Sequence, residues 1–503
     1  MSDMVTLIVD GKRIQAEEGA LLLPTLLHNG IMVPHFCYHD ALGPDGNCRM
    51  CMVGIEGQKR PQIACDTAVK KDMVVSTQNE DINDVKRKIL ELELLSHPVD
   101  CPICDQAGEC SLQDYYMEFG LGEARRPKEE KKLKDKKLDI GKNIILDQER
   151  CVLCARCTRF TQEITHTNEL AIIGRGNDAR VSTVPGQQMH TPYAMNIIDL
   201  CPVGALTSKD FRFKQRVWFM HSAKGVCHGC AKGCNIYLDH NQEKYKSDTL
   251  YRFRPRLNAK VNGHFICDEG RLSYKKENRE RLNEFYMRNK IVSEETALSH
   301  LLYSLNHMHP LIIVSPSLSL EELCVIQLLS QHFQLDVHAF SEGYEDTGFE
   351  DSWLRSKDRS ANLAGIKKFD IKTSKEALIK ALECTALVIN FDHKAFLETN
   401  PVYQTLLVHK KEIHLTSHLF ENCKHKELVI PMRSYSEKKG TLINEDGVIQ
   451  KFEAGLCNEK KSLLQILNML ISTPSTPEEV WEEHLEDVFA FSYNDIPEEG
   501  REV

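Results

Sequence analysis

The cysteines of this 503-residue chain are concentrated in its first half. Fifteen of the 19 precede residue 268, and they form four groups. The groups are Cys37, Cys48, Cys51 and Cys65; Cys101, Cys104 and Cys110, with His97 just upstream; Cys151, Cys154, Cys157 and Cys201; and Cys227, Cys230, Cys234 and Cys267. Thiolates in runs of this kind hold iron–sulfur clusters. The pattern therefore predicts a series of clusters along one chain.

The bulk composition is that of a soluble globular protein, with 42% hydrophobic and 27% charged residues. The length predicts several domains, and no apolar run reaches the ~18 residues of a membrane span. The N-terminal residues MSDMVTLIVDG resemble neither a secretory signal nor a transit peptide. We therefore expect a reducing cytoplasm, where clustered cysteines indicate metal or redox sites. A net charge of −10 argues against nucleic acid as a partner.

The first group has the spacing C-x10-C-x2-C-x13-C, which suits a [2Fe–2S] cluster although its first gap exceeds that of plant-type ferredoxins. A structural zinc site is the alternative, but zinc sites usually contain two close cysteine pairs, and only one is present. In the second group, HPVDCPICDQAGEC, three cysteines are one short of a [4Fe–4S] ligand set. Either His97 is the fourth ligand, which we favour, or the site is open. A neutral imidazole in place of a thiolate should favour the reduced state.

The third group resembles half of a two-cluster ferredoxin module, in which C-x2-C-x2-C-x3-C-P occurs twice and the last cysteine of each run serves the other cluster. The first run has Thr161 in place of its last cysteine. The second run ends in Cys201-Pro202, and its earlier ligand positions hold Thr191, Ala194 and Ile197. One complete ligand set remains and its neighbour is absent, so the spacing predicts one [4Fe–4S] cluster.

The fourth group, C-x2-C-x3-C-x32-C, also predicts a [4Fe–4S] cluster, and Gly225, Gly229 and Gly233 allow close approach of the backbone. Zinc is again the alternative. The cysteine spacing of the fourth group resembles that of the [4Fe–4S] segment that opens molybdopterin oxidoreductases. The remaining cysteines lack any CxxC pattern and are interpreted as structural packing residues. They are Cys324, Cys384, Cys423 and Cys457.

Local patterns predict several elements. Strands are expected at Val5–Val9 and Arg13–Ala16 around an Asp10-Gly11 turn, followed by a helix at Leu21–His28. A second helix, Asp84–Ser96, is expected to be amphipathic, because Val85, Ile89, Leu92 and Leu95 recur near helical spacing. The lysine-rich residues 125–142 are expected to be a solvated linker, with a docking surface for an acidic partner as the alternative.

After about residue 290, apolar runs alternate with helical stretches, which predicts an α/β domain with a mostly parallel sheet. The expected strands are Leu311–Val314, Ala386–Phe391 and Glu412–Leu415, and the expected helices include Glu321–His332 and Ser374–Leu382. The acidic residues 477–487 are expected to form a solvated helix.

The motifs FCYH, GNCRMCMV, HPVDCPICDQAGECSLQD, CVLCARCTRF and DLCPVGALTSKD together resemble the large iron–sulfur subunit, designated G, of respiratory NADH:quinone oxidoreductase, complex I. The resemblance covers about residues 1–275. Residues 426–452, KELVIPMRSYSEKKGTLINEDGVIQKF, resemble a segment of the molybdopterin oxidoreductase superfamily.

The resemblance implies an α+β multidomain protein. We expect a β-grasp [2Fe–2S] ferredoxin domain at 1–80, a one-histidine, three-cysteine [4Fe–4S] module with a charged linker at 81–140, and a ferredoxin-like [4Fe–4S] module at 141–215. A [4Fe–4S] segment of the molybdopterin-oxidoreductase type follows at 216–285, and a shortened, degenerate α/β domain at 286–503. One [2Fe–2S] and three [4Fe–4S] clusters are implied. No flavin, NAD or molybdopterin is expected on this chain, since no GxGxxG follows a strand and the region after Cys267 is short.

The implied function is electron transfer within the proton-translocating NADH dehydrogenase, from a flavin- and NADH-binding subunit toward quinone. Electrons should enter at the first group, pass to the third and then the second, and leave to a ferredoxin-like two-cluster subunit. The Cys227 group should lie off that path. The chain should be peripheral on the cytoplasmic side of the bacterial inner membrane, contacting the membrane only through the complex. The alternatives are an electron-relay subunit of a hydrogenase or formate dehydrogenase complex, and a structural zinc scaffold.

Overall fold

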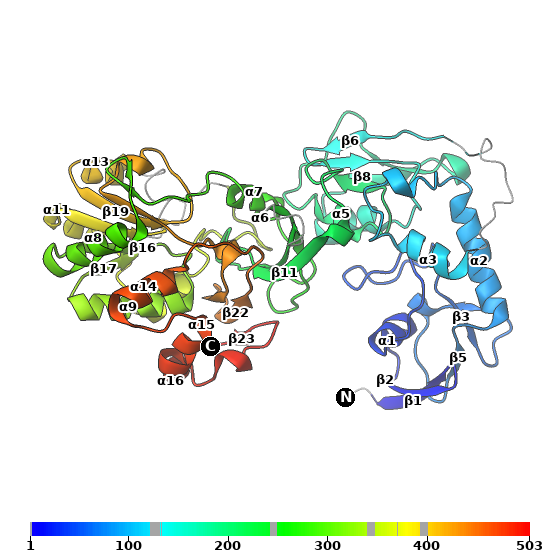
Figure 1. Ribbon diagram of the computed structural model, residues 1–503. Helices are drawn as coiled ribbons and strands as arrows, with labels where there is room; N and C mark the ends of the chain where they lie inside the picture. Colours follow the sequence, from blue (N-terminus) through cyan, green and yellow to red (C-terminus); the bar gives the residue numbers. More distant parts are fainter. Residues whose placement is uncertain are drawn as a thin grey trace. The chain divides into compact units, whose positions relative to one another are not determined.

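The computed structural model describes residues 3–120, 131, 133–241, 249–339, 348–369, 371–392 and 401–503. The chain divides into two compact units, Met1–Phe219 and Met220–Val503 (Figure 1). Within the described residues, no helix combines the length and apolar character that crossing a bilayer requires.

The first unit begins with a five-stranded sheet in the order β2-β1-β5-β3-β4. The strands are β1 (Met4–Val9), β2 (Lys12–Glu17), β3 (Met52–Ile55), β4 (Gln62–Ile63) and β5 (Val74–Ser76). The turn between β1 and β2 has positive φ at Asp10 and Gly11, which matches the twist of the hairpin. Helix α1 (Leu22–His28) buries three leucines against this sheet. The predicted hairpin and helix are confirmed.

Two helices follow the sheet, α2 (Glu80–Leu94) and α3 (Ser111–Phe119), and they pack against each other (Figure 1). The Asn79 side chain accepts a hydrogen bond from the Ile82 amide and caps α2. The predicted helix is confirmed, but its fully buried side chains are not those of the apolar stripe. The buried side chains are Ile82, Lys86 and Leu90, whereas Leu92 is 66% exposed. The helix begins earlier than expected, and contacts with α3 select a face one position away from the apolar stripe.

The rest of the first unit contains a three-stranded antiparallel sheet, a hairpin and short helices. These elements are β6 (Leu138–Gly141), β7 (Ile144–Leu146), β10 (Leu206–Ser208), β8 (Leu170–Ile173), β9 (Arg180–Thr183), α4 (Arg156–Arg159), the π-helix Phe160–Ile164 and α5 (Asn196–Leu200). The lysine-rich segment lies partly outside the described residues. Its described part is not a purely solvated linker, because Lys134 donates to the Ala179 carbonyl at 2.9 Å and Lys136 pairs with Glu149 at 2.7 Å.

The second unit opens with an antiparallel sheet, β11-β12-β13. Its strands are β11 (Met220–Val226), β12 (Asn235–Asn241) and β13 (Leu250–Pro255), and the short helices α6 (Asp268–Leu272) and α7 (Tyr274–Glu277) follow. The fourth cysteine group lies on this segment: Cys227 directly follows β11, and Cys267 caps the start of α6.

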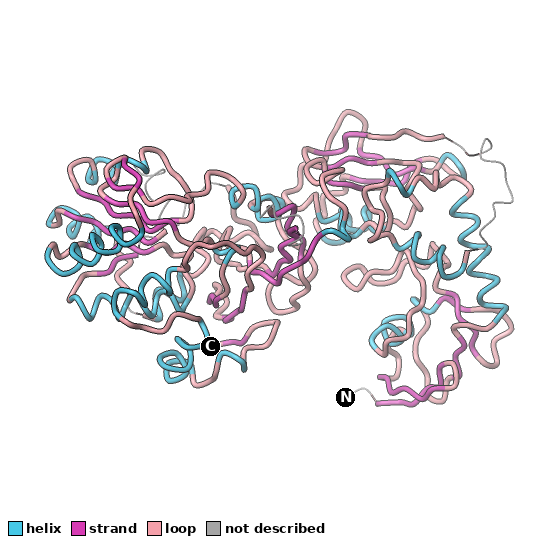
Figure 2. Tube along the Cα trace, viewed as in Figure 1, coloured by secondary structure: helices cyan, strands magenta, loops and turns pink. Residues whose placement is uncertain are grey.

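A seven-stranded sheet in the order β15-β14-β20-β19-β18-β16-β17 forms the body of the second unit (Figure 2). The strands are β14 (Tyr286–Met287), β15 (Lys290–Ile291), β16 (Leu311–Val314), β17 (Val337–Ala339), β18 (Leu387–Phe391), β19 (Lys411–Thr416) and β20 (Leu428–Pro431). The five strands β16 to β20 run parallel to one another, whereas β14 pairs with β20 in the antiparallel direction. The predicted strands, and the predicted parallel sheet, are confirmed.

Helices cover both faces of this sheet. Alternate residues of β16 point to opposite faces: Ile312 and Val314 pack with α8 (Glu294–His307), α9 (Leu320–Phe333) and α10 (Leu363–Lys368). Leu311 and Ile313 pack with α11 (Lys375–Cys384) and α13 (Pro401–Leu407). The predicted helices at 321–332 and 374–382 correspond to α9 and α11.

The C-terminal part adds a small antiparallel sheet and a helical tail. These elements are β21 (Gly440–Ile443), β22 (Val448–Phe452), β23 (Arg501–Glu502), α14 (Leu463–Ile471), α15 (Pro477–Val480), the π-helix Trp481–Leu485 and α16 (Glu486–Phe489). The prediction of a solvated helix at 477–487 is wrong in one respect. Trp481 is completely buried in the core, and its indole N–H donates to Glu321 at 2.7 Å, so only one face of this tail is solvated.

Candidate iron–sulfur sites

The first cysteine group is gathered in the loops of the N-terminal five-stranded sheet, and all four side chains are buried. The backbone amides of Phe36 and Cys37 lie 3.4 and 3.5 Å from the sulfur of Cys48. Hydrogen bonds from Cys48 and Cys65 lower the pKa of Cys37, and they raise the pKa of both donors. The Cys51 thiol is likewise hydrogen-bonded to Cys65, and this hydrogen bond lowers the pKa of Cys51. Thiols crowded in this way ionise together only beside a cation, and iron would supply that charge.

The second group follows α2, with Cys101 in a short 3-10 helix, Cys101–Ile103, and Cys110 at the start of α3. His97 is buried, and its Nδ1 atom has no hydrogen-bond partner among the described residues. Burial lowers the pKa of His97 to about 4, so the ring is neutral at physiological pH. A neutral imidazole with an unpartnered buried nitrogen is suited to coordinate a metal.

A glycine leaves room for the second group. A β-carbon at Gly204 would overlap the sulfur of Cys104, so only glycine fits at this position. The loop is anchored by Arg150, which donates to both carboxylate oxygens of Asp100 at 3.0 and 2.7 Å, and by Arg216, which donates to the Cys104 and Pro102 carbonyls. The loop that carries Cys101 and Cys104 is therefore anchored by two arginines, and Cys104 lies against Gly204.

The third group lines one cavity. All four cysteines contribute to its wall, together with apolar side chains that include Leu146, Val181 and Leu206. Leu153 and Ala155 both adopt positive φ, which winds the Cys151–Cys157 loop tightly and points the Leu153 amide at the sulfur of Cys151, 3.4 Å away. Burial raises the pKa of Cys151 to about 12 and also raises the pKa of Cys157. A cavity walled by four thiols, two of them buried and two partly exposed, fits a [4Fe–4S] cluster.

The fourth group is buried in the second unit, and backbone amides point at its sulfurs. The Gly229 amide lies 3.4 Å from the sulfur of Cys227, and the Gly270 amide lies 3.3 Å from that of Cys267. A β-carbon at Gly270 would lie 3.0 and 3.3 Å from these two sulfurs. Burial raises the pKa of Cys267 to about 11. The site therefore suits a bulky group that binds the thiolates of Cys227 and Cys267 and that the backbone at Gly229 and Gly270 approaches closely.

Outside the four groups, Cys324 and Cys423 are buried, as expected for packing residues. Cys384 and Cys457 are exposed, so the packing interpretation is wrong for them. In the described part of the chain, no three His, Cys, Asp or Glu side chains converge closely enough to hold one metal ion. Cluster ligands are spaced more widely than ligands of a single ion, because the iron–sulfide core lies between them.

Three family models match the first unit. Residues 2–80 match a 2Fe-2S iron-sulfur cluster binding domain, residues 86–125 match the NADH-ubiquinone oxidoreductase-G iron-sulfur binding region, and residues 141–207 match the ferredoxin-like domain of NADH-quinone oxidoreductase subunit 3. Each match contains one complete cysteine group, in the order in which the groups occur along the chain.

Curated relatives extend this similarity. The NADH-ubiquinone oxidoreductase 75 kDa subunit of Reclinomonas americana is 36% identical over 61% of this chain and 44% of its own length. The NADH-quinone oxidoreductase-G subunit of Rickettsia typhi is 32% identical over 73% of this chain and 54% of its own length. The first part of the chain is therefore similar in sequence to these subunits of the NADH-quinone and NADH-ubiquinone oxidoreductases. The chain spans about half the length of the relatives that it matches.

A solved structure of an NAD+-reducing [NiFe]-hydrogenase in the H2-reduced state also matches, at 28% identity over 42% of this chain and 91% of that chain, with a TM-score of 0.39. In the chain itself, a 2Fe-2S domain and 4Fe-4S domains are present in the order that the cysteine pattern predicts.

Sequence reasoning missed several residues that shape these sites. Gly204 and Gly270 were not singled out, although each lies three residues after a predicted ligand, Cys201 or Cys267. Arg156 and Arg159, on either side of Cys157, were also missed, because nothing in the sequence shows what their side chains contact. His228, between two cysteines of the fourth group, packs against Tyr435 in a tilted arrangement, with ring centroids 4.0 Å apart.

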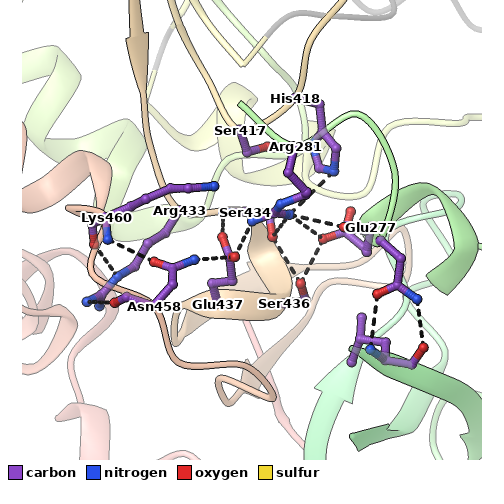
Figure 3. A network of polar contacts seen from close by, with 12 residues as sticks. Glu277, Arg281, Ser417, His418, Arg433, Ser434, Ser436, Glu437, Asn458 and Lys460 are labelled. Atoms are coloured by element: carbon purple, nitrogen blue, oxygen red, sulfur yellow. Dashed lines mark hydrogen bonds and ion pairs between the residues drawn. The ribbon is translucent and has the colours of Figure 1, made fainter. Parts of the chain in front are cut away.

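A polar network occupies the carboxyl ends of β19 and β20 in the second unit (Figure 3). Arg281 donates to the Ser434 hydroxyl at 2.9 Å and pairs with Glu437. Ser436 donates to Glu277 at 2.8 Å. Arg433 donates to the Lys460 carbonyl at 2.6 Å, which ties the loop after β20 to the segment before α14. The polar side chains of this edge are therefore bonded largely to one another.

Proposed function

We propose that this chain is the electron-transfer subunit of the peripheral arm of an NADH:quinone oxidoreductase, relaying electrons from a flavin-containing subunit toward quinone. The observation that carries the proposal is the arrangement of three cysteine-lined sites, in order, within the three matched domains of the first unit. No side chain needs to act as acid, base or nucleophile, because bound clusters supply the redox chemistry and the protein sets spacing, potential and solvent access.

The proposed ligands are the four groups described above. The first group would hold a [2Fe–2S] cluster, and the second, with His97, a [4Fe–4S] cluster. The third and fourth groups would each hold a further [4Fe–4S] cluster. Flavin, NAD and molybdopterin would belong to other proteins.

The proposed route runs from the first site to the third and then to the second. Contacts between ligand loops support this order. The Asn47 side chain, next to Cys48, donates to the Leu153 carbonyl at 3.4 Å. The Ser111 amide, next to Cys110, donates to the Pro202 carbonyl at 2.9 Å. The third site therefore shares contacts with both of the others. The Cys227 site lies in the other unit, and we propose that its role is structural.

The proposed partners are other complex I subunits: a flavin- and NADH-binding subunit as donor, and a ferredoxin-like two-cluster subunit as acceptor. The chain would be peripheral, on the cytoplasmic side of a bacterial inner membrane, and would touch the membrane only through the complex.

We propose that the α/β body is a shortened relative of the molybdopterin oxidoreductases that holds no pterin. Open parallel sheets bind ligands outside the carboxyl ends of their strands. At that edge, Ser417 and His418 follow β19 and Ser434 follows β20, and the network of Figure 3 uses these groups for internal hydrogen bonds. This internal pairing supports the proposal, because a pterin would need the same groups.

Iron and sulfide analysis of the full chain, purified without oxygen, tests the cofactor assignment. One [2Fe–2S] and three [4Fe–4S] clusters require about 14 iron atoms per chain, with EPR signals of both cluster types after reduction. Zinc in place of iron would reject the redox function. In cells lacking the chain, NADH-to-quinone turnover of the membranes should be lost and should return with the wild-type chain; turnover independent of the chain would reject the assignment to this complex.

A further inference from the structure

Two arginines lie beside Cys157 of the third site, and both donate hydrogen bonds to residues of the first site's ligand loop. Arg156 and Arg159 belong to the short helix α4, and both side chains are buried, with 8% and 6% of their surface exposed. A buried guanidinium is costly unless its donors find acceptors. The acceptors of these two side chains show what the pair connects.

Arg156 contacts residues adjacent to ligands of both sites. One of its terminal nitrogens donates to the carbonyl of Tyr38, which follows Cys37 of the first site. The other donates at 3.1 Å to the carbonyl of Leu200, which precedes Cys201 of the third site. Because Arg156 itself precedes Cys157, a single guanidinium joins the backbones that carry ligands of the two sites.

Arg159 completes the connection from the same helix. It donates to the carbonyls of Cys37 and Gly43, each at 3.4 Å, and to that of Leu42. These acceptors span the loop that leads from Cys37 to Cys48. Arg159 also pairs with Glu163, one turn along the chain, at 3.0 Å.

The charges of the two arginines are compensated differently. The Glu163 carboxylate, whose side chain is 47% exposed, partly neutralises Arg159. Among the described residues, the hydrogen bonds of Arg156 go to backbone carbonyls, and its Nε atom is buried without a partner. Arg156 also contributes to the wall of the cavity that Cys151, Cys154, Cys157 and Cys201 line. The Arg156 charge is therefore felt inside the third site.

We propose that Arg156 and Arg159 are positioning residues that fix the first site against the third and shift both sites toward the reduced state. The inference rests on the proposed function, since it requires clusters at both sites. Positive charge buried beside a site stabilises an added electron there. Carbonyl contacts on both ligand loops hold the two sites at a constant separation. An arginine is charged at every accessible pH, so the bias does not vary with pH.

The arginines take no part in the bond chemistry of the transfer. One electron leaves the first site, which is oxidised, and arrives at the third site, which is reduced. No proton moves with it, because an arginine side chain in a protein remains a donor-only cation. The contribution of the pair is to the driving force and to the geometry.

Arg156→Gln removes one charge while keeping a polar, hydrogen-bonding side chain. In the full chain, we expect EPR-monitored redox titration to show lower midpoint potentials for both clusters, with the reduction equilibrium at each falling at least tenfold, about 59 mV for one electron. The shift should be equal at about pH 6.5 and about pH 8.5, because arginine stays charged throughout this range. The matched control is Arg175→Gln, which removes an exposed arginine from the β8–β9 hairpin and should leave both potentials unchanged.

Glu163→Gln tests the same electrostatics with the opposite sign, at an exposed residue whose loss should not impair folding. Releasing Arg159 from its carboxylate should raise the potential of the first site. If Arg156→Gln loses iron, the Glu163→Gln result decides alone. The inference would be overturned if Arg156→Gln and Glu163→Gln, where they retain both clusters, had the same midpoint potentials as the Arg175→Gln control. If the wild-type chain shows no cluster signal at these sites, the proposed function fails instead, so the two failures are distinguishable.

Discussion

The candidate sites depend on small side chains beside the sulfurs as much as on the sulfurs themselves. Gly204 lies against Cys104, although it is carried by the loop of the third site, and Gly270 lies against Cys227 and Cys267. A methyl group at Gly204 would overlap the Cys104 sulfur, and one at Gly270 would lie 3.0 and 3.3 Å from the Cys227 and Cys267 sulfurs, which would have to move apart to admit it. The same residues therefore offer a test of each site separately.

Gly204→Ala should abolish the [4Fe–4S] cluster of the second site, because its methyl group would overlap the Cys104 sulfur. Gly270→Ala should abolish only the [4Fe–4S] cluster of the fourth site. Each variant should lose about four iron atoms per chain, and each serves as the control for the other. EPR spectra and iron analysis of both proteins provide the measurement. Retention of every signal in either variant would show that the glycine is not part of the site's wall.

His97→Cys should retain a cluster and lower its potential. A thiolate adds a negative charge where a neutral imidazole stood, so the added electron is less stable. We expect the reduction equilibrium to fall at least tenfold, about 59 mV, in an EPR-monitored titration. His28→Cys, at the exposed end of α1, is the control. An unchanged potential in His97→Cys would exclude His97 as a ligand.

At the scale of secondary-structure elements, α2 shows how tertiary contacts override a local pattern. Lys86 is buried on this helix, where it donates to the Thr77 carbonyl at 2.7 Å and lies 4.9 Å from the centre of the Phe119 ring. Burial lowers the pKa of Lys86 to about 8 from its usual 10.5. The aliphatic part of the side chain packs where an apolar residue would be expected, so no local pattern signals its burial.

The buried lysine predicts a pH dependence of stability. Between pH 8 and 10.5 the unfolded chain binds the proton that the folded chain has released, so folding becomes more favourable as pH rises. Relative to Lys86→Met, the wild type should therefore gain stability across this range, by up to about 3 kcal/mol. Urea unfolding at several pH values measures the gain. The control is Lys88→Met, on the exposed side of α2, which should show no such pH-dependent difference from the wild type. A stability difference between wild type and Lys86→Met that does not change with pH would contradict the lowered pKa of Lys86.

The C-terminal tail provides a second case at this scale. Residues 477–487 are rich in acidic side chains, and the sequence predicts full exposure. Trp481 instead stacks on Phe489 and Phe491, with ring centroids 5.3 and 5.5 Å apart, and bonds the buried Glu321. Trp481 thus anchors this acidic helix together with the buried Val480 and Leu485, because its large apolar area outweighs the solvation of its neighbours.

At the scale of the whole molecule, the sites are distributed unequally between the two units. The first, second and third groups lie in Met1–Phe219, where ligand loops contact one another, and the fourth lies in Met220–Val503. The loop of the fourth group is tied into its own unit, where Arg359 donates to the Gly229 carbonyl at 2.9 Å and pairs with Glu269. Loss of the fourth site should therefore be felt mainly in the second unit.

Cys267→Ser should cost stability more than electron transfer. Without its fourth ligand the site should lose its cluster, and the thermal unfolding midpoint of the second unit should fall by several degrees. NADH-to-quinone turnover of assembled complex should be retained. The control is Cys384→Ser, which changes an exposed cysteine outside the four groups. Collapse of turnover in a fully assembled Cys267→Ser complex would place the fourth site on the electron path.

The sequence alone determined which residue types gather and in what order. Cluster ligands are close in the chain, so spacings such as C-x2-C-x2-C are local and readable, and the parallel sheet follows from alternating apolar runs and helical stretches. The hairpin of β1 and β2 was equally readable from Asp10-Gly11.

Only the tertiary structure decided what lies between and against the sites. It placed Gly204 beside a sulfur of another group, buried Lys86, and set Arg156 between two ligand loops that are far apart in the chain. These contacts join segments of different modules, and neither partner carries a local signal of the other. Side-chain burial and long-range hydrogen bonding arise from packing of the whole unit, which no window of the sequence contains.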